Sequence, residues 1–375
     1  MTSTEETRAL RDATRRLVRA TTPRTADEHV EQTSAPLDRT AWLAMAERLG
    51  LQAVRVPEEL GGTGLGLEEQ LLVHEEMGRA LYGGPFVPVV GQVVPALLGL
   101  ADDEPVRAMV RQISAGKLIV VPAFARWYDR NASLPVLRDG DNLSGVVPTV
   151  LEGLDVDAWL VPALDGDEPV IALVLAGDQH SMVTPLPSAD LTRRFADVEF
   201  SGASATVLAR GARALEAMEA LETGAVLALS AESVGIAAEA LAMTIDYVKV
   251  REQFGQVIGS FQSIKHQVSE LFVLLESARS ALAGAVDAVD QATAMRTASL
   301  AVARRRCGST GFRIANEAIH LHGGIGFTWE HRIHLYYRRA KTNEVLLDER
   351  GTQARVLAAS VSELYAHGNG IGRVP

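Results

Sequence analysis

The apolar residues of this chain change their spacing twice along the sequence. From about residue 5 to residue 116 they recur every three or four positions, the period of an amphipathic helix. Between about residues 118 and 210 they form short, β-branched runs bounded by Gly, Pro, Asp and Asn, which is typical of strands. After residue 212 the helical period returns. The pattern predicts an N-terminal helical domain (1–117), a small antiparallel β domain (118–211) and a C-terminal four-helix bundle (212–375).

One apolar stretch is long enough to cross a membrane. No charged residue lies between Arg79 and Asp102, and this length matches the roughly 30 Å of a bilayer core. Pro85, Pro88 and Pro95 each remove a backbone hydrogen bond that lipid could not replace. We therefore expect a buried connection between helices and no interaction with a membrane.

The charge balance restricts the kind of partner. The 375 residues carry 36 Lys and Arg against 47 Asp and Glu, a net charge of −11, so a nucleic acid would be repelled on average.

The single cysteine, Cys307, is expected to be a buried, unreactive thiol rather than a reactive one. The N-terminal residues mix acidic and basic side chains without an apolar core, which argues against a signal peptide and favours a cytoplasmic location. We expect no metal site.

Three segments carry the candidates for chemistry. REQFGQVIGSFQ (251–262) interrupts a helical pattern with two glycines, which indicates a closely approaching group or a plain connector between helices. HLHGGIGF (320–327) contains a Gly pair that lets backbone N–H groups approach an anion, or simply forms a tight turn. YYRRAKTNEVLLDERGT (336–352) is basic in its first half and acidic in its second, and by itself would be a solvated helix face.

The glycine-rich GGTGLG (61–66) could be mistaken for a dinucleotide-binding fingerprint. That fingerprint requires a preceding strand, a following helix and a βαβ unit. No strand–helix alternation surrounds these residues, so we expect only a turn here.

In this order and spacing, the three segments resemble the acyl-CoA dehydrogenase family. The family pattern Arg-x-x-Phe-Gly-x-x-Ile-x-x-Phe-Gln is matched by residues 251–262, and Gly-Gly-x-Gly-Phe by residues 323–327. A weaker match, Val-Pro-Glu-Glu followed by Gly-Gly, covers residues 56–62. The resemblance implies that family's fold, with a helical domain, a middle β domain and a C-terminal bundle, but it is faint in the β domain.

The resemblance also implies a cofactor, FAD, which is shared between neighbouring subunits. Arg251 would reach the FAD pyrophosphate of a neighbour, since a guanidinium forks onto phosphate oxygens. The cofactor-binding residues implied in this way are Arg251, Gln253, Phe254, Gln262, His320, Leu321, His322, Gly323, Gly324 and Thr352. Implied partners are an acyl-CoA substrate, an electron-transfer flavoprotein or similar acceptor, and further subunits in a homo-oligomer or a heterotetramer.

The reaction implied by the resemblance, α,β-dehydrogenation of an acyl thioester, needs one carboxylate as the base that removes the α proton. The family's usual position for that base falls on Leu347, and its alternative position on Ala225. Glu349 could serve after a small loop shift, with Asp348 next, while Glu232 lies two turns beyond Ala225.

Three functions therefore stay open. The first is a complete FAD-dependent acyl-CoA dehydrogenase with Glu349 as its base. The second is a subunit of a heteromeric dehydrogenase that completes the FAD site of another chain. The third is an acyl-CoA oxidase, or a dehydrogenase that acts on a carrier-protein thioester.

The β domain departs from the family pattern. PAFARWYDRNASLP (122–135) and SGVVPTVLEG (144–153) stand where relatives contact the flavin ring, and Arg193 or Arg194 is expected to contact substrate or solvent.

Overall fold

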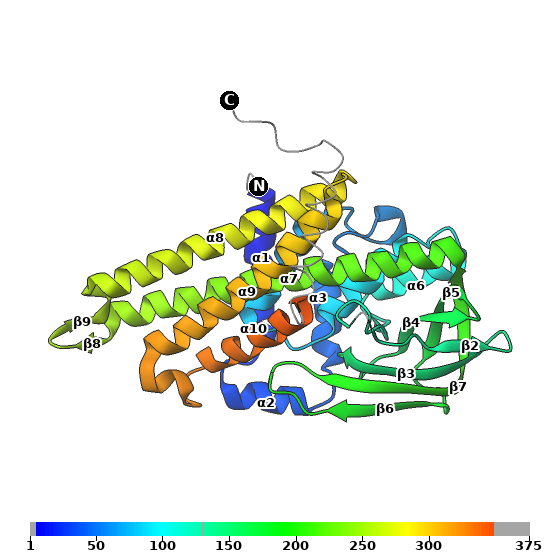
Figure 1. Ribbon diagram of the computed structural model, residues 1–375, viewed down its shortest axis with the longest axis horizontal. Coiled ribbons are helices and arrows are strands. Elements are labelled where there is room, and N and C mark those ends of the chain that lie inside the picture. Colours follow the sequence, from blue (N-terminus) through cyan, green and yellow to red (C-terminus); the bar gives the residue numbers. More distant parts are fainter. Residues whose placement is uncertain (1–4, 130, 349–375) are drawn as a thin grey trace.

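Helices, strands and helices follow one another along the chain, as the apolar spacing predicts. The computed structural model describes residues 5–129 and 131–348. The first helical block comprises α1 (Glu5–Thr21), α2 (Ala26–Ser34), α3 (Arg39–Leu49), η1 (Leu51–Ala53), η2 (Glu58–Leu60), α4 (Leu67–Ala80), η3 (Val87–Val93), α5 (Val94–Leu98) and α6 (Glu104–Ser114). The predicted fold class, with a β domain between two helical regions, is confirmed (Figure 1).

Local sequence fixes the ends of the early helices. Thr25 and Glu28 form a capping box at the start of α2, in which each side chain satisfies a backbone N–H at the other end of the first turn. Asp38 accepts hydrogen bonds from the first amides of α3, and Gly50 ends that helix in the left-handed conformation.

The seven strands of the β domain form one sheet. They are β1 (Val120–Pro122), β2 (Val136–Arg138), β3 (Asn142–Leu151), β4 (Ala158–Asp165), β5 (Glu168–Leu175), β6 (Ser181–Leu186) and β7 (Phe195–Arg210). The strand order is β1-β4-β2-β3-β7-β5, and β5 also pairs with β4, so five of the strands close into a small barrel. Strand β6 lies on the outside edge of β7.

The spacing predicted an antiparallel sheet, but the sheet in the structure is mixed. Strands β1 and β2 both run parallel to β4, while the remaining pairs are antiparallel. Tight hairpins enforce the antiparallel direction only where they join β2 to β3 and β4 to β5. The longer connection from β1 to β2 carries no such constraint.

Helix α7 (Gly211–Val250) is the central helix, against which many of the other elements pack. It runs from the β domain to the opposite end of the molecule and contacts α4, η3, α8, α9 and α10 (Figure 1). Its length and composition would allow it to cross a membrane, but 89% of its apolar window is buried inside the protein. It is therefore a core helix, which explains why it is apolar on all sides.

The rest of the C-terminal region packs along α7. It comprises the two-stranded hairpin β8 (Glu252–Gln253) and β9 (Gln256–Val257), η4 (Ile258–Ser260), α8 (Gln262–Asp290), α9 (Arg296–His322), η5 (Gly323–Phe327) and α10 (Ile333–Asp348). Helices α7 to α10 provide the four helices of the predicted bundle (Figure 1).

Cys307 is buried in α9, and burial raises the pKa of its thiol to about 12, so the prediction of an unreactive thiol is supported.

Two further predictions about local structure hold. The charge-free stretch between Arg79 and Asp102 forms the π-helical η3 and the short α5, and nearly all of η3 and α5 is buried. Residues 61–66 form a turn between η2 and α4 with no preceding strand, so they are not a dinucleotide fingerprint.

A buried charge network joins the three regions. Glu232 on α7 accepts from Arg193, which precedes β7, and from Arg339 on α10 at 2.7 Å. Arg339 also donates to Asp190 at 2.9 Å and to the Tyr82 carbonyl that follows α4. All four charged side chains are almost completely buried, so the expectation that Arg193 contacts substrate or solvent is wrong.

Arg194 is engaged within the chain as well. Its guanidinium contacts Glu152 at 3.3 Å and Asp155 at 2.5 Å, both in the connection between β3 and β4. These two arginines therefore hold the loop before β7 against its neighbours.

Candidate functional site

The β8–β9 hairpin carries the first predicted motif at one tip of the molecule (Figure 1). Arg251 follows directly after α7, and Phe254 and Gly255 make the turn with φ of 53° and 78°. Arg251, Gln253 and Phe254 are all exposed, and the Phe254 ring has 92% of its surface accessible. Within the described residues the Arg251 guanidinium has no ion pair.

The start of α8 lies immediately after the hairpin. Gln262 is its first residue and is exposed. No side chain caps the helix, because Phe261 occupies the N-cap position. The first backbone N–H groups of a 29-residue helix are therefore free to bind an anion.

The second motif lies where α9 ends. His320, Gly323 and Gly324 are exposed, and Gly323 adopts φ of 63°. A Cβ built on either glycine would meet no atom within 4 Å, so another molecule can approach the main chain closely. The side chains of Leu321 and His322 face the interior instead, which leaves only their main chain available to a ligand.

His322 connects the two motifs. Its ring stacks on Tyr247, one turn before Arg251, with 4.5 Å between the ring centroids. Its Nδ1 contacts the Ala318 carbonyl at 2.7 Å, and its other face lies 4.5 Å from the His331 ring. Burial, together with the neighbouring cations, lowers the pKa of His331 to about 4, so the His331 ring is uncharged near neutral pH. The stack therefore joins the end of α7, which precedes Arg251, to the end of α9, which precedes the Gly323–Gly324 turn.

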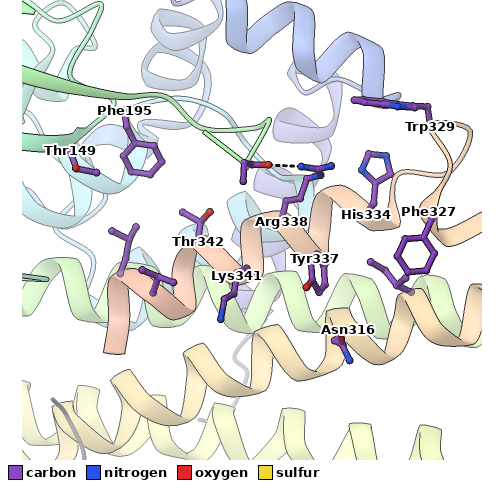
Figure 2. Close-up of a pocket in the computed structure, with 14 residues that line it drawn as sticks. Thr149, Phe195, Asn316, Phe327, Trp329, His334, Tyr337, Arg338, Lys341 and Thr342 are labelled. Carbon is purple, nitrogen blue, oxygen red and sulfur yellow. Dashed lines mark hydrogen bonds between the residues drawn. The ribbon is translucent and has the colours of Figure 1, made fainter. Parts of the chain in front are cut away.

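A large crevice lies between the β domain and α10. It has a volume of about 660 Å³, and Figure 2 shows Thr149 and Phe195 at the β-domain end and Phe327, Trp329 and His334 at the other. Along its floor, α10 contributes Tyr337, Arg338, Lys341 and Thr342. Arg338 donates to the Ala189 carbonyl at 2.9 Å, and Lys341 pairs with Glu344 at 2.8 Å. The crevice therefore combines aromatic walls with cations, which suits a planar, anionic ligand.

Neither family position for the base holds an acid. Leu347 is fully buried near the end of α10, and its carbonyl accepts from Arg304. Ala225 is fully buried on α7. Glu232 is unsuitable as a base, because its carboxylate is sealed between two guanidinium groups. Although burial acts to raise its pKa, those cations outweigh it and hold the pKa below its usual value.

The remaining predicted residues lie at or beyond the end of α10. Asp348 is the last residue of that helix, and Glu349 and Thr352 lie outside the described residues.

The contact between η3 and α7 is unusually close. A Cβ built on Gly224 would lie 1.9 Å from the Gly91 carbonyl oxygen, and one on Gly91 would lie 2.6 Å from the Ala228 side chain. The two main chains therefore touch at this level, and no acyl chain fits between them there.

Comparison with known proteins accounts for this arrangement. Residues 4–117 match the acyl-CoA dehydrogenase N-terminal domain, and residues 212–361 match the acyl-CoA dehydrogenase C-terminal domain. The chain belongs to the acyl-CoA dehydrogenase family. It is therefore an oxidoreductase of a family whose members typically bind FAD.

One relative of the chain is acyl-CoA dehydrogenase IpdE2 of Mycolicibacterium smegmatis. It is 30% identical over 357 residues, which cover 95% of this chain and 99% of the relative. The ChsE4-ChsE5 complex from Mycobacterium tuberculosis has a chain with 26% identity and a TM-score of 0.86, covering 96% of this chain and 98% of that one. A variant of the Tcur3481-Tcur3483 steroid ACAD matches with 27% identity and a TM-score of 0.84, covering 96% of this chain and 99% of that one.

The residues present fit the FAD that the family implies. An unpaired guanidinium, an uncapped helix start and two glycines with free space beside their main chain are the groups that a diphosphate needs. Sequence reasoning found these residues, but it missed Tyr247 and His331, which position them. No spacing rule indicated that the rings of Tyr247 and His322, 75 residues apart, would stack.

Proposed function

We propose that this chain is a subunit of a heteromeric, FAD-dependent acyl-CoA dehydrogenase and that it completes the FAD site of a neighbouring chain. The observation that carries the proposal is the exposed β8–β9 hairpin. It presents Arg251, Gln253 and Phe254 to solvent, away from the chain's own crevice beside the β domain. Groups placed in this way are suited to a ligand held by a second subunit.

The roles of the individual groups follow from their chemistry. Arg251 donates paired hydrogen bonds to the diphosphate, and the amides of Gly323 and Gly324 donate from the opposite motif. Gln262 contributes at the start of α8, where the helix dipole also favours negative charge. The chemistry that bound FAD would supply is a hydride acceptor for the β carbon of an acyl thioester.

Two features of the described residues favour a heteromeric assembly. Leu347 and Ala225 replace the acid at both customary positions, and the Gly91–Gly224 contact closes the space between η3 and α7. The names of two similar structures each join two different chains, ChsE4-ChsE5 and Tcur3481-Tcur3483. We infer that a second chain supplies the base, the acyl pocket and the contacts to the flavin ring.

A second candidate is a self-sufficient dehydrogenase with Glu349 as its base. The order Glu349, Arg350, Gly351, Thr352 favours it, because a Glu-Gly-Thr stands near this position in the family. In either case an electron-transfer flavoprotein or a similar acceptor would reoxidise the cofactor, and a cytoplasmic location is part of the proposal.

The visible spectrum of the purified chain separates the two candidates. The proposal predicts a colourless chain that becomes yellow only when it is co-purified with a second dehydrogenase subunit. A yellow chain with one flavin each, reduced on addition of acyl-CoA, would overturn it. In that case Glu349→Gln should abolish turnover while FAD is retained, and unchanged turnover would remove Glu349 as the base.

The role of Arg251 is tested in the same assembly. Arg251→Met should weaken FAD binding by about tenfold or more, because a charge-assisted hydrogen bond is worth about 1.5–3 kcal/mol. Arg313→Met changes another exposed arginine, on the face of α9, and should leave FAD affinity unchanged. Equal FAD affinity in both variants would exclude Arg251 from the cofactor site.

A further inference from the structure

A second, smaller cavity lies on the other side of α7. Its volume is about 220 Å³, and it borders the Gly91–Gly224 contact, enclosed by α4, η3, α5, α7 and the ends of α8 and α9. Leu227, which lines the cavity, belongs to a hydrophobic cluster with residues of α4 and α8. Ala225 and Leu347, at the family's two positions for the base, belong to a different cluster. The cavity is therefore separate from the crevice and from the motifs assigned above.

Polar groups around this cavity have unused hydrogen-bonding capacity. Gln70 is only 2% exposed; its amide nitrogen donates to the Val90 carbonyl at 3.2 Å, but its Oε1 has no partner among the described residues. The buried Nε of Arg296 is also unpartnered there, although its other nitrogens bind Glu219 and Thr223. A buried acceptor without a donor is unfavourable, so a ligand that donates to Gln70 Oε1 would be stabilised here.

Arg55 adds a half-buried positive charge at the same cavity. Its guanidinium has no hydrogen bond or ion pair with any residue of 5–129 or 131–348. Burial lowers its pKa, and only the exposed Asp290 acts in the opposite direction. A guanidinium in such surroundings is stabilised by an anion that brings two oxygens to its planar fork.

The rest of the wall is apolar. Leu98, Leu227 and Val289 face the cavity and contain no polar side-chain atoms. The volume equals that of about seven water molecules at roughly 30 Å³ each, so it suits a molecule of about seven non-hydrogen atoms.

We propose that this cavity binds a small organic carboxylate that also carries a hydroxyl group. The carboxylate pairs with Arg55, the hydroxyl donates to Gln70 Oε1, and the short carbon chain packs against Leu98, Leu227 and Val289. The apolar wall favours a carboxylate over inorganic phosphate, which would leave that wall uncovered.

Isothermal titration of the full-length chain, with its partner subunit if the two purify together, tests the proposal with 2-hydroxybutyrate. We expect one site per chain, and binding at least tenfold weaker for 1,2-butanediol, which lacks the charge. Arg55→Met should weaken 2-hydroxybutyrate binding at least tenfold, whereas Arg138→Met, at an exposed position on β2, should not change it.

A second variant keeps the test independent of folding effects at Arg55. In the wild-type chain, 2-hydroxybutyrate should bind more tightly than butyrate, and Gln70→Met should remove that difference. No saturable binding, equal binding to the Arg55→Met variant, or a preference for inorganic phosphate would each overturn the proposal. Flavin content is unaffected by these variants, so the outcome is separate from that for the proposed function.

Discussion

The buried carboxylate of Glu232 should be the side chain whose neutralisation costs most stability. It lies between Arg193 and Arg339, and all three side chains are at least 95% buried. Glu232→Gln keeps the shape but removes the negative charge that both guanidiniums require. Removing one member of a buried ion pair costs about 3–5 kcal/mol, because the remaining charge stays desolvated and uncompensated.

The expected loss can be read as a melting temperature. At about 2.1 cal/mol/K per residue, a chain of 375 residues has an unfolding entropy of about 0.8 kcal/mol/K. The substitution should therefore lower Tm by about 4–6 °C in calorimetry. Glu239→Gln is the matched control on the same helix: its partners Arg19, Arg79 and Arg332 are all more exposed than Arg193 and Arg339, so the loss should be smaller, about 1 kcal/mol.

The pH dependence provides a second measurement. Since the folded-state pKa of Glu232 is lowered, its stabilising effect is complete above the unfolded value near 4.3 and is lost as the pH falls through the folded value. The Glu232→Gln variant should therefore lose less stability than the wild type on acidification below about pH 4.3. A Tm within about 1 °C of the wild type at neutral pH would refute this reasoning.

Three further predictions concern other parts of the molecule. Gly224→Ala places a Cβ 1.9 Å from the Gly91 oxygen and should lower the free energy of unfolding in urea by about 1–3 kcal/mol. The control Gly284→Ala, whose Cβ meets no atom within 4 Å, should raise it by about 0.5–1 kcal/mol. A Gly224→Ala variant more stable than the Gly284→Ala variant would contradict the close contact. Cys307 should resist a thiol reagent until the chain unfolds, and labelling of native protein at the rate of a free thiol would disprove its burial. Because the pKa of His331 is lowered to about 4, the unfolded state binds more protons between pH 6.5 and 4. Stability should therefore decrease as the pH falls from 6.5 to 4. His331→Phe should make this decrease smaller in a pH series of thermal melts, without removing it, because the pKa values of His29 and His74 are also lowered to about 4.

Strands with weak apolar patterns were the part of the fold that the sequence did not predict. β6 (Ser181–Leu186) contains Pro185 and is largely exposed at the edge of β7, so it lacks the alternation of a half-buried strand. β2 has only three residues, too short for a period to be recognised. β6 pairs with β7 alone, and β2 lies between β3 and β4, so both strands depend on longer neighbours, which is a tertiary effect.

The sequence by itself determined the order of the blocks and the chemistry of the two cofactor motifs. Spacing along one helix or strand is local, so the stripes of α7 and α8 and the residues 251–262 could be recognised without a structure. Motif letters did not distinguish which side chains turn inward: His320 is exposed, whereas His322 stacks between Tyr247 and His331. Likewise, the tertiary structure alone pairs Glu232 with Arg193 and Arg339 and closes η3 onto α7. Contacts between residues distant in sequence depend on how whole elements pack, and these contacts decide which motif residues remain free for a second subunit.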